Sequence, residues 1–132
     1  MARKKRTLKI LIVDDSPEVV DILAQLCDYR VHEVFCAKDG ADGLILSRAE
    51  PDIDMVFTDY KMPKMDGAEI TKRIKDGYQD LPVVLVTGSV VVTDSELESA
   101  GFDEVVHKPF ELKIIADSIA RFHAQSGLDV DN

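Results

Sequence analysis

Four short runs of apolar residues are each followed at once by residues that can carry chemistry. The runs are unbroken rather than alternating, which is typical of strands buried on both faces of a parallel sheet. Groups at the carboxyl ends of such strands gather at one edge of the sheet. The junctions are Leu11-Ile12-Val13 before Asp14 and Asp15, Met55 to Thr58 before Asp59, Val83 to Val86 before Thr87, and Val105 to His107 before Lys108. The pattern predicts three carboxylates, a hydroxyl and an ammonium group at one sheet edge.

Strands and helices are predicted to alternate along the chain. The predicted strands cover residues 8–13, 31–36, 53–58, 81–86 and 103–107. The predicted helices cover residues 17–27, the stretch from the Asp39-Gly40 turn to just before Pro51, the stretch from Gly67 to 75, and residues 93–100 and 111–125. Such alternation requires parallel pairing through right-handed crossovers. The expected fold class is therefore α/β, with a doubly wound five-stranded parallel sheet in a three-layer sandwich.

Two of the predicted helices carry an apolar stripe. In the first, Ser16 is expected to be the N-cap and Pro17 the first helical residue. The stripes comprise Val19, Ile22, Leu23 and Leu26 in the first helix, and Leu112, Ile115, Ile119 and Phe122 in the last. Spacing by three and four residues places each set on one helix face, where it forms one apolar stripe.

Length and charge narrow the class of protein. A chain of 132 residues forms one domain, and folding at this size buries about two thirds of the unfolded surface. We expect a basic tail over residues 1–6, a domain over 7–125 and a short tail over 126–132. The net charge of −9 opposes nonspecific binding to nucleic acid or an anionic membrane.

The sequence shows no pattern typical of a membrane segment, a signal peptide or a cysteine metal site. No apolar segment reaches the roughly 18 residues of a membrane-spanning helix, and the basic start is not followed by a signal-peptide core, so a cytoplasmic location is expected. Cys27 and Cys36 have no metal-ligand spacing. We expect both thiols to be buried or unreactive.

The converging acidic groups suggest a metal site. Asp14, Asp15 and Asp59 would repel one another at close range, and a hard divalent cation relieves that repulsion. Magnesium fits because it binds oxygen ligands and keeps open positions for a phosphoryl group. Lys108 and Thr87 would then contact phosphoryl oxygens, and a carboxylate nucleophile would form a labile acyl phosphate.

Four segments in order resemble the receiver domain of bacterial two-component response regulators, in particular stand-alone, chemotaxis-regulator-like receivers. They are Ile10 to Pro17, Phe57 to Gly67, Val84 to Ser89 and Val106 to Phe110, within a match over residues 7–125. The resemblance implies a flavodoxin-like (βα)5 fold and a phosphoryl group accepted on Asp59 from a sensor histidine kinase or histidine phosphotransfer protein.

The resemblance also implies roles for individual residues. Magnesium would be bound by Asp15 and Asp59 through carboxylates, by Asp14 through water and by Lys61 through its backbone carbonyl. Thr87 would grip the phosphoryl oxygen and shift toward it, and Lys108 would pair with the phosphate, next to a cis bond to Pro109. The surface of the fourth helix, fifth strand and fifth helix would contact an unidentified downstream protein, as a monomer or a phosphorylation-dependent dimer.

Each site residue also has a simpler interpretation as a helix cap, a turn residue or a solvated charge. Asp66 is expected to cap the helix after the 59–67 loop, and His107 to be structural. One departure concerns the switch: many receivers carry Tyr or Phe three residues before the lysine, where this chain has Val105. Two interpretations are open for the apolar segment Val90-Val91-Val92: an exposed contact surface or a buried loop.

Several functions compete. The first is a stand-alone switch that catalyses only its own phosphorylation and dephosphorylation and is not a turnover enzyme. The alternative is a phosphoryl shuttle or sink, or the receiver piece of a hybrid kinase. A haloacid dehalogenase-type phosphatase is disfavoured because no DxDx[TV] motif is present, and a nucleotide or flavin binder because no glycine-rich loop follows the first strand.

Overall fold

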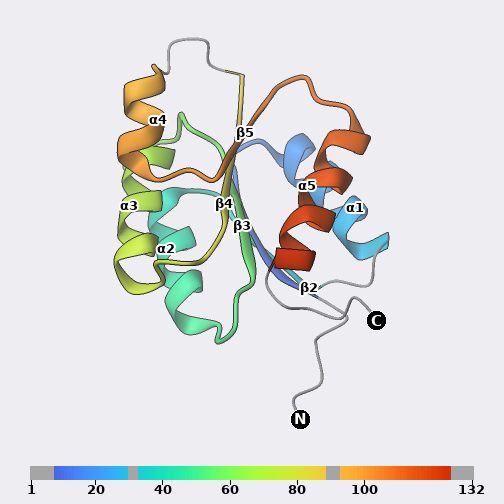
Figure 1. The fold of residues 1–132 in the computed structure, drawn as a ribbon, viewed down its shortest axis with the longest axis horizontal. Coiled ribbons are helices and arrows are strands. Elements are labelled where there is room, and N and C mark those ends of the chain that lie inside the picture. Colours follow the sequence, from blue (N-terminus) through green and yellow to red (C-terminus); the bar gives the residue numbers. More distant parts are fainter. Residues whose placement is uncertain (1–7, 30–32, 89–92, 126–132) are drawn as a thin grey trace.

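A five-stranded parallel sheet lies between two layers of helices (Figure 1). The computed structural model describes residues 8–29, 33–88 and 93–125. The strand order is β2-β1-β3-β4-β5. The strands are β1 (Lys9–Val13), β2 (Glu33–Ala37), β3 (Met55–Thr58), β4 (Val83–Thr87) and β5 (Glu104–His107). The helices are α1 (Pro17–Tyr29), α2 (Gly40–Ala49), α3 (Gly67–Gly77), α4 (Asp94–Ala100) and α5 (Leu112–Gln125). The predicted fold class is confirmed.

Each face of the sheet has its own apolar core. Along β1, Ile10 and Ile12 face the layer of α1 and α5, whereas Leu11 and Val13 face the layer of α2 and α3. Apolar residues of the helices pack against these two faces. They are Leu23, Ile115, Ile119 and Phe122 on one side and Leu44, Ile70 and Ile74 on the other. Because both faces are covered, β3 and β4 are buried along their whole length. This burial explains why their sequences are unbroken apolar runs.

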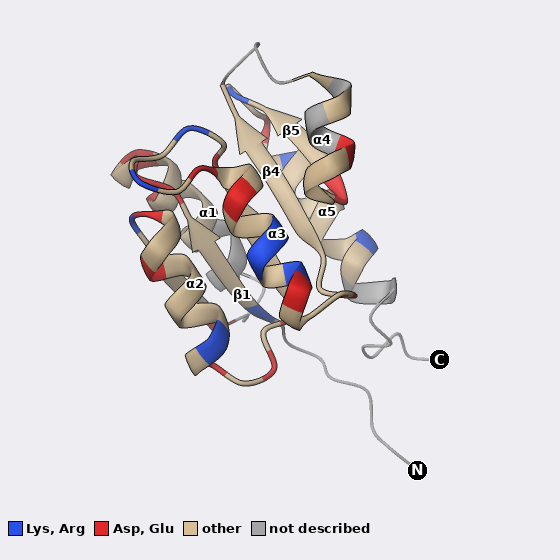
Figure 2. Cartoon of the chain, turned by 90° about the vertical axis from the view of Figure 1, so that its left-hand side faces the viewer, with Lys and Arg blue, Asp and Glu red and all other residues tan. Residues whose placement is uncertain are grey.

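Charged residues lie along the solvent-facing side of α3. Figure 2 shows acidic and basic residues along the exposed side of α3. There Arg73 Nε donates to Glu69 Oε2 at 2.7 Å, and both side chains are about half exposed. A pair this open to solvent contributes little to stability. Within the described residues, no helix is long and apolar enough to cross a membrane.

Two residues of the apolar stripes and one of the two thiols are exposed. Ile22 in α1 and Leu112 in α5 lie 43% and 54% exposed, because only part of each stripe is covered by the sheet and its neighbouring helix. Cys36 is exposed, since it lies on β2 at the edge of the sheet, which leaves the unreactive thiol of its two expected states. The side chains of Leu26 and Cys27, and residues 89–92 with the Val90-Val91-Val92 segment, lie outside the described residues.

The predicted start of α1 and the predicted cap of α3 are both supported by hydrogen bonds. The Ser16 carbonyl accepts from the Val20 amide at 3.1 Å, as expected of an N-cap residue. Asp66 accepts the Glu69 amide on its side chain at 2.9 Å and so caps α3. The Gly67 amide also donates a hydrogen bond to the Tyr60 carbonyl at 2.7 Å. This hydrogen bond and the Asp66 cap together close the loop after β3.

The loop after β3 also depends on Gly67. A Cβ atom at this position would lie 2.2 Å from the Asp59 carbonyl oxygen. We expect Gly67→Ala to lower the free energy of unfolding by about 1–3 kcal/mol, because backbone must move to relieve the contact. Urea denaturation followed by circular dichroism measures it.

Gly77, in the last turn of the same helix, is the matched control. A Cβ there meets nothing within 4 Å, so Gly77→Ala should leave stability unchanged or raise it by up to about 1 kcal/mol. Equal destabilisation by the two substitutions would contradict the close-approach argument.

Candidate functional site

The carboxyl ends of four strands bring the predicted site residues to one edge of the sheet. Asp14 follows β1, Asp59 follows the adjacent strand β3, Thr87 ends β4 and Lys108 follows β5. The Lys108 ammonium donates to Asp14 Oδ2 and to Asp59 Oδ2, at 3.1 Å in each case. A lysine on the outermost strand therefore reaches past β4 to a pair of carboxylates at the centre of the sheet.

The two carboxylates bridged by the lysine are positioned by backbone donors. Asp14 Oδ1 accepts the Ser16 amide at 2.8 Å, and Asp59 Oδ1 accepts the Tyr60 amide at 2.7 Å. The Asp59 amide in turn donates to the Val13 carbonyl at 2.9 Å, which ties the ends of β1 and β3 together. Each carboxylate thus has one oxygen bound to the backbone and the other to Lys108.

The three acidic residues form a group that could hold a metal ion. One carboxylate oxygen from each of Asp14, Asp15 and Asp59 lies within 4.8 Å of the other two. Asp14 is 2% exposed and Asp59 is 9% exposed, whereas Asp15 is exposed to solvent. An all-oxygen set of this kind suits a hard divalent cation such as magnesium, so the donors fit the metal expected from the sequence.

Burial and charge act in opposite directions on the buried pair. Burial raises the pKa of Asp14, and it outweighs the opposing effects of the Ser16 amide and the Lys108 ammonium. The pKa of Lys108 is also raised: its burial acts to lower it, but the hydrogen bonds and charges of Asp14 and Asp59 together prevail. The site therefore favours a charged lysine and resists a fully ionised acidic group.

Thr87 and Lys61 are placed differently. Thr87 is buried at the end of β4, and its carbonyl accepts the Lys108 amide at 2.8 Å. Lys61 is exposed, two residues beyond Asp59 in the loop after β3. The bond between Lys108 and Pro109 is cis, as the resemblance implied. The structure brings Asp14, Asp15, Asp59 and Lys108 together, with Thr87 joined to them through the Lys108 backbone.

The sequence analysis missed the close contact of Gly40 with the loop after β3. A Cβ on Gly40 would lie 2.6 Å from the Met65 carbonyl oxygen, and one on Gly67 would meet the Asp59 carbonyl. These two glycines let the start of α2 and the start of α3 approach the backbone that carries Asp59. Their signal in the sequence was only a glycine at the first position of each helix.

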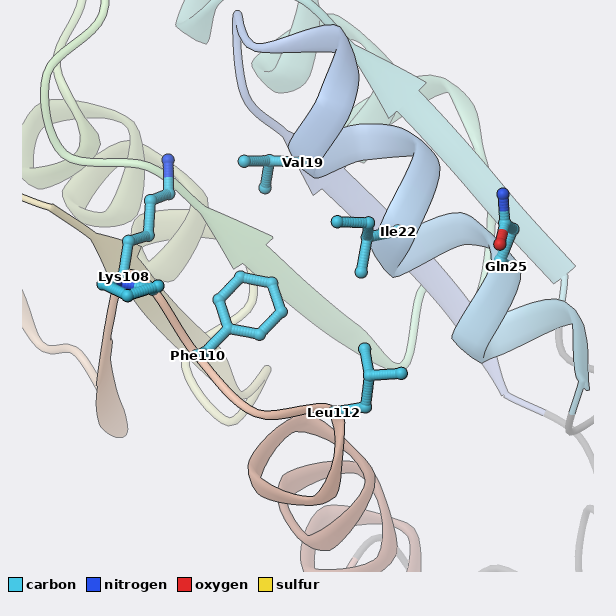
Figure 3. Close-up of a pocket in the computed structure, with 7 residues that line it drawn as sticks. Val19, Ile22, Gln25, Lys108, Phe110 and Leu112 are labelled. Carbon is cyan, nitrogen blue, oxygen red and sulfur yellow. The ribbon is translucent and has the colours of Figure 1, made fainter.

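An apolar groove beside Lys108 was also missed. It has a volume of about 720 Å³ and runs between α1 and the segment joining β5 to α5. Its lining residues are Val19, Ile22, Gln25, Lys108, Pro109, Phe110 and Leu112. Figure 3 shows Val19 and Ile22 on one side of it, with Phe110 and Leu112 on the other. The exposed Ile22 and Leu112 therefore belong to one hollow that ends at the site lysine.

Three relatives illustrate the similarity of this chain to known proteins. Histidine kinase 3 of Arabidopsis thaliana is 31% identical over 137 residues, which is 86% of this chain and 13% of that protein. The CheY-like response regulator receiver domain protein of Methanospirillum hungatei JF-1 has a TM-score of 0.84 at 25% identity, over 91% of this chain and 97% of that one. A response regulator receiver domain protein of Clostridium thermocellum has a TM-score of 0.81 at 28% identity, over 90% and 96%.

The family relationship follows from a match over most of the sequence. The chain spans only a small part of the length of its plant relative. By contrast, the family model of the response regulator receiver domain matches residues 10–120, from β1 into α5. The chain therefore belongs to the response regulator receiver domain family of two-component signalling.

Proposed function

We propose that this receiver accepts a phosphoryl group on Asp59 from a phosphohistidine and thereby changes its affinity for another protein. Receiver domains are signalling modules that interact with histidine kinases or phosphotransfer proteins, not enzymes that turn over a separate substrate. The observation that carries the proposal is the Lys108 ammonium, 3.1 Å from Asp59 Oδ2. It supplies a positive charge beside the carboxylate that would become the acyl phosphate.

The transfer step needs little chemistry from the protein beyond positioning. An Asp59 carboxylate oxygen attacks the phosphorus, a P–O bond forms, and the P–N bond of the phosphohistidine breaks. The bonding electrons leave with the donor imidazole, which departs as neutral imidazole if its other nitrogen carries a proton and otherwise takes up one proton from water. Lys108 then pairs with a phosphoryl oxygen in place of the Asp59 carboxylate, and the Thr87 hydroxyl donates to another.

Receiver domains bind magnesium in an acidic pocket, and the cluster of three aspartate carboxylates in this chain fits that ion. Asp15 and Asp59 would bind it directly, Asp14 through water and Lys61 through its carbonyl. When bound, magnesium neutralises negative charge on the phosphoryl oxygens. The raised pKa of Asp14 supports this assignment, since a buried acidic group gains most from a cation.

The apolar groove is the best-supported docking surface for the phosphoryl donor. Lys108 lies at its end and also contacts Asp59, so a partner seated in the groove lies beside the phosphoacceptor. The apolar walls suit one face of an amphipathic helix, and the rest of the helix would carry the phosphohistidine toward the site.

A second candidate function is a phosphoryl shuttle, or the receiver part of a hybrid kinase. The similarity to histidine kinase 3 favours it, because this chain matches only 13% of that protein's length. Rapid return of the phosphoryl group from Asp59 to a histidine donor would distinguish a shuttle from a switch with a long-lived phosphorylated state.

Phosphorylation can be tested by intact mass. With acetyl phosphate and magnesium, the wild type should gain the mass of one phosphoryl group, and Asp59→Asn should gain none because its amide is not a nucleophile. Asp66→Asn is the matched control, since Asp66 is an exposed cap in the same loop and Asn also caps helices. A gain in Asp59→Asn, or a gain that survives a chelator, would contradict the proposal.

The cost of the acidic group can be tested by thermal unfolding. Without metal at neutral pH, Asp14→Asn should raise the melting temperature by a few degrees, because the wild type must bury a carboxylate whose pKa is raised. A raised pKa means that the folded state binds the proton more tightly than the unfolded state does. The stability that protonated Asp14 contributes at acid pH is therefore lost as the pH rises through that pKa. The advantage of Asn should therefore shrink toward acid pH.

Magnesium should reverse the order of the two proteins. The ion binds the folded state and stabilises it by mass action, and the wild type retains the full acidic group. Titration with magnesium should raise the melting temperature of the wild type more than that of Asp14→Asn. A metal-free Asp14→Asn protein that melts below the wild type would refute the argument.

Docking at the groove can be tested by protein-to-protein transfer. With a phosphorylated histidine phosphotransfer protein that is active on the wild type as probe, Ile22→Glu should slow transfer at least tenfold by placing a charge in the groove. Ile45→Glu is the matched control, because Ile45 is 63% exposed on α2, on the opposite helical layer. Both variants should react normally with acetyl phosphate, and equal slowing by both would exclude the groove.

A further inference from the structure

His107 is the neighbour of Thr87 across the last pair of strands. The β4–β5 register places Thr87 opposite His107 and Leu85 opposite Val105. Thr87 is 1% exposed, whereas His107 is exposed to solvent. One strand pair thus joins a buried residue of the site to a titratable ring at the surface.

The two side chains lie on the same face of the sheet. Val106, between Val105 and His107, belongs to the core beneath α1 and α5. Because successive residues of a strand point to opposite faces, His107 points toward the opposite helical layer, as its registered partner Thr87 does. Adjacent strands are about 4.8 Å apart, so the two side chains leave neighbouring positions on the same face of the sheet.

The backbone holds the pair together at this end of the sheet. The Lys108 amide donates to the Thr87 carbonyl at 2.8 Å, so the strands are bonded directly after the pair. On its other side, β5 has no neighbouring strand within the described sheet. The backbone bond therefore fixes the register of the pair, and no further strand of the described sheet lies beyond His107.

Val105 is poorly suited to the same task. It lies on the same face as His107 but one pair earlier, opposite Leu85 rather than Thr87. Its branched side chain is restricted about χ1 and has no ring or polar atom to present to a partner. Of the described residues of β5, His107 alone combines register with Thr87, exposure and a hydrogen-bonding side chain.

We propose that His107 transmits the position of Thr87 to the protein surface, so that the orientation of its imidazole at the β5 edge differs between the two states of the site. This inference rests on the proposed function, because Thr87 is taken to move when a phosphoryl group is present on Asp59. His107 is a positioning residue that presents a hydrogen-bonding ring to a partner at the exposed edge of the sheet, and it takes no part in the chemistry.

The test is the NMR signal of the His107 ring at constant pH. Magnesium and beryllofluoride, a tetrahedral stand-in for the phosphoryl group, are added to the wild type, Thr87→Ser and Thr87→Ala. The ring signal is assigned with His107→Gln, and fluorine NMR reports independently whether the site holds beryllofluoride. The ring signal should move by more than its linewidth in the wild type and in Thr87→Ser, and should stay within its linewidth in Thr87→Ala.

The outcomes separate the inference from the proposed function. No bound fluorine signal in the wild type would count against the proposed site itself. A bound fluorine signal with a stationary His107 ring, or an equal ring shift in Thr87→Ala, would overturn the role of His107 alone. If Thr87→Ala does not bind beryllofluoride, the reciprocal measurement decides. The displacement of the Thr87 methyl signal on adding beryllofluoride should differ between the wild type and His107→Ala, and an equal displacement in the two proteins overturns the inference.

Discussion

The site depends on one ammonium group held between two buried carboxylates. Asp14 and Asp59 repel each other and lose hydration on burial, and Lys108 compensates by contacting both at 3.1 Å. This requirement explains the arrangement of the sheet edge. The two acidic residues follow adjacent central strands, whereas the lysine follows the edge strand and crosses β4 to reach them. A strand order that separated β1 from β3 would not bring the two carboxylates to one cation.

Backbone amides bind the carboxylate oxygens that Lys108 does not contact. The amides of Ser16 and Tyr60 each satisfy one carboxylate oxygen, which leaves the other oxygens for a cation or a phosphoryl group. The loop that carries Asp59 is held in turn by the Gly67 amide and by the Asp66 cap. The acidic group is therefore positioned by rigid backbone rather than by long side chains, and such preorganisation lowers the cost of binding a metal ion.

The surroundings of the site differ on its two sides. Toward α1 and α5, Lys108 adjoins an apolar groove whose walls include the exposed Ile22 and Leu112. Toward the opposite helical layer, Thr87 adjoins the exposed His107 at the sheet edge. Two site residues thus lie next to different surfaces: Lys108 lines the groove, and Thr87 is paired with the β5 edge. Under the proposed function, the phosphoryl donor and the downstream partner contact the domain on different faces.

The sequence by itself determined the parallel sheet and the residues at its carboxyl edge. Unbroken apolar runs predict buried strands, and parallel pairing brings the residues after them together. It could not determine that Asp14 is buried while the adjacent Asp15 is exposed, because the turn after β1 decides which carboxylate points inward.

Only the tertiary structure decided how far each surface is covered. Helical spacing placed Ile22 and Leu112 on apolar stripes, but both remain exposed because none of the described helices and strands extends over them. The close approach of Gly67 to Asp59 and the pairing of Thr87 with His107 likewise join residues distant in sequence. Periodicity is a local property that identifies the apolar side of an element, whereas burial and register depend on the element packed against it.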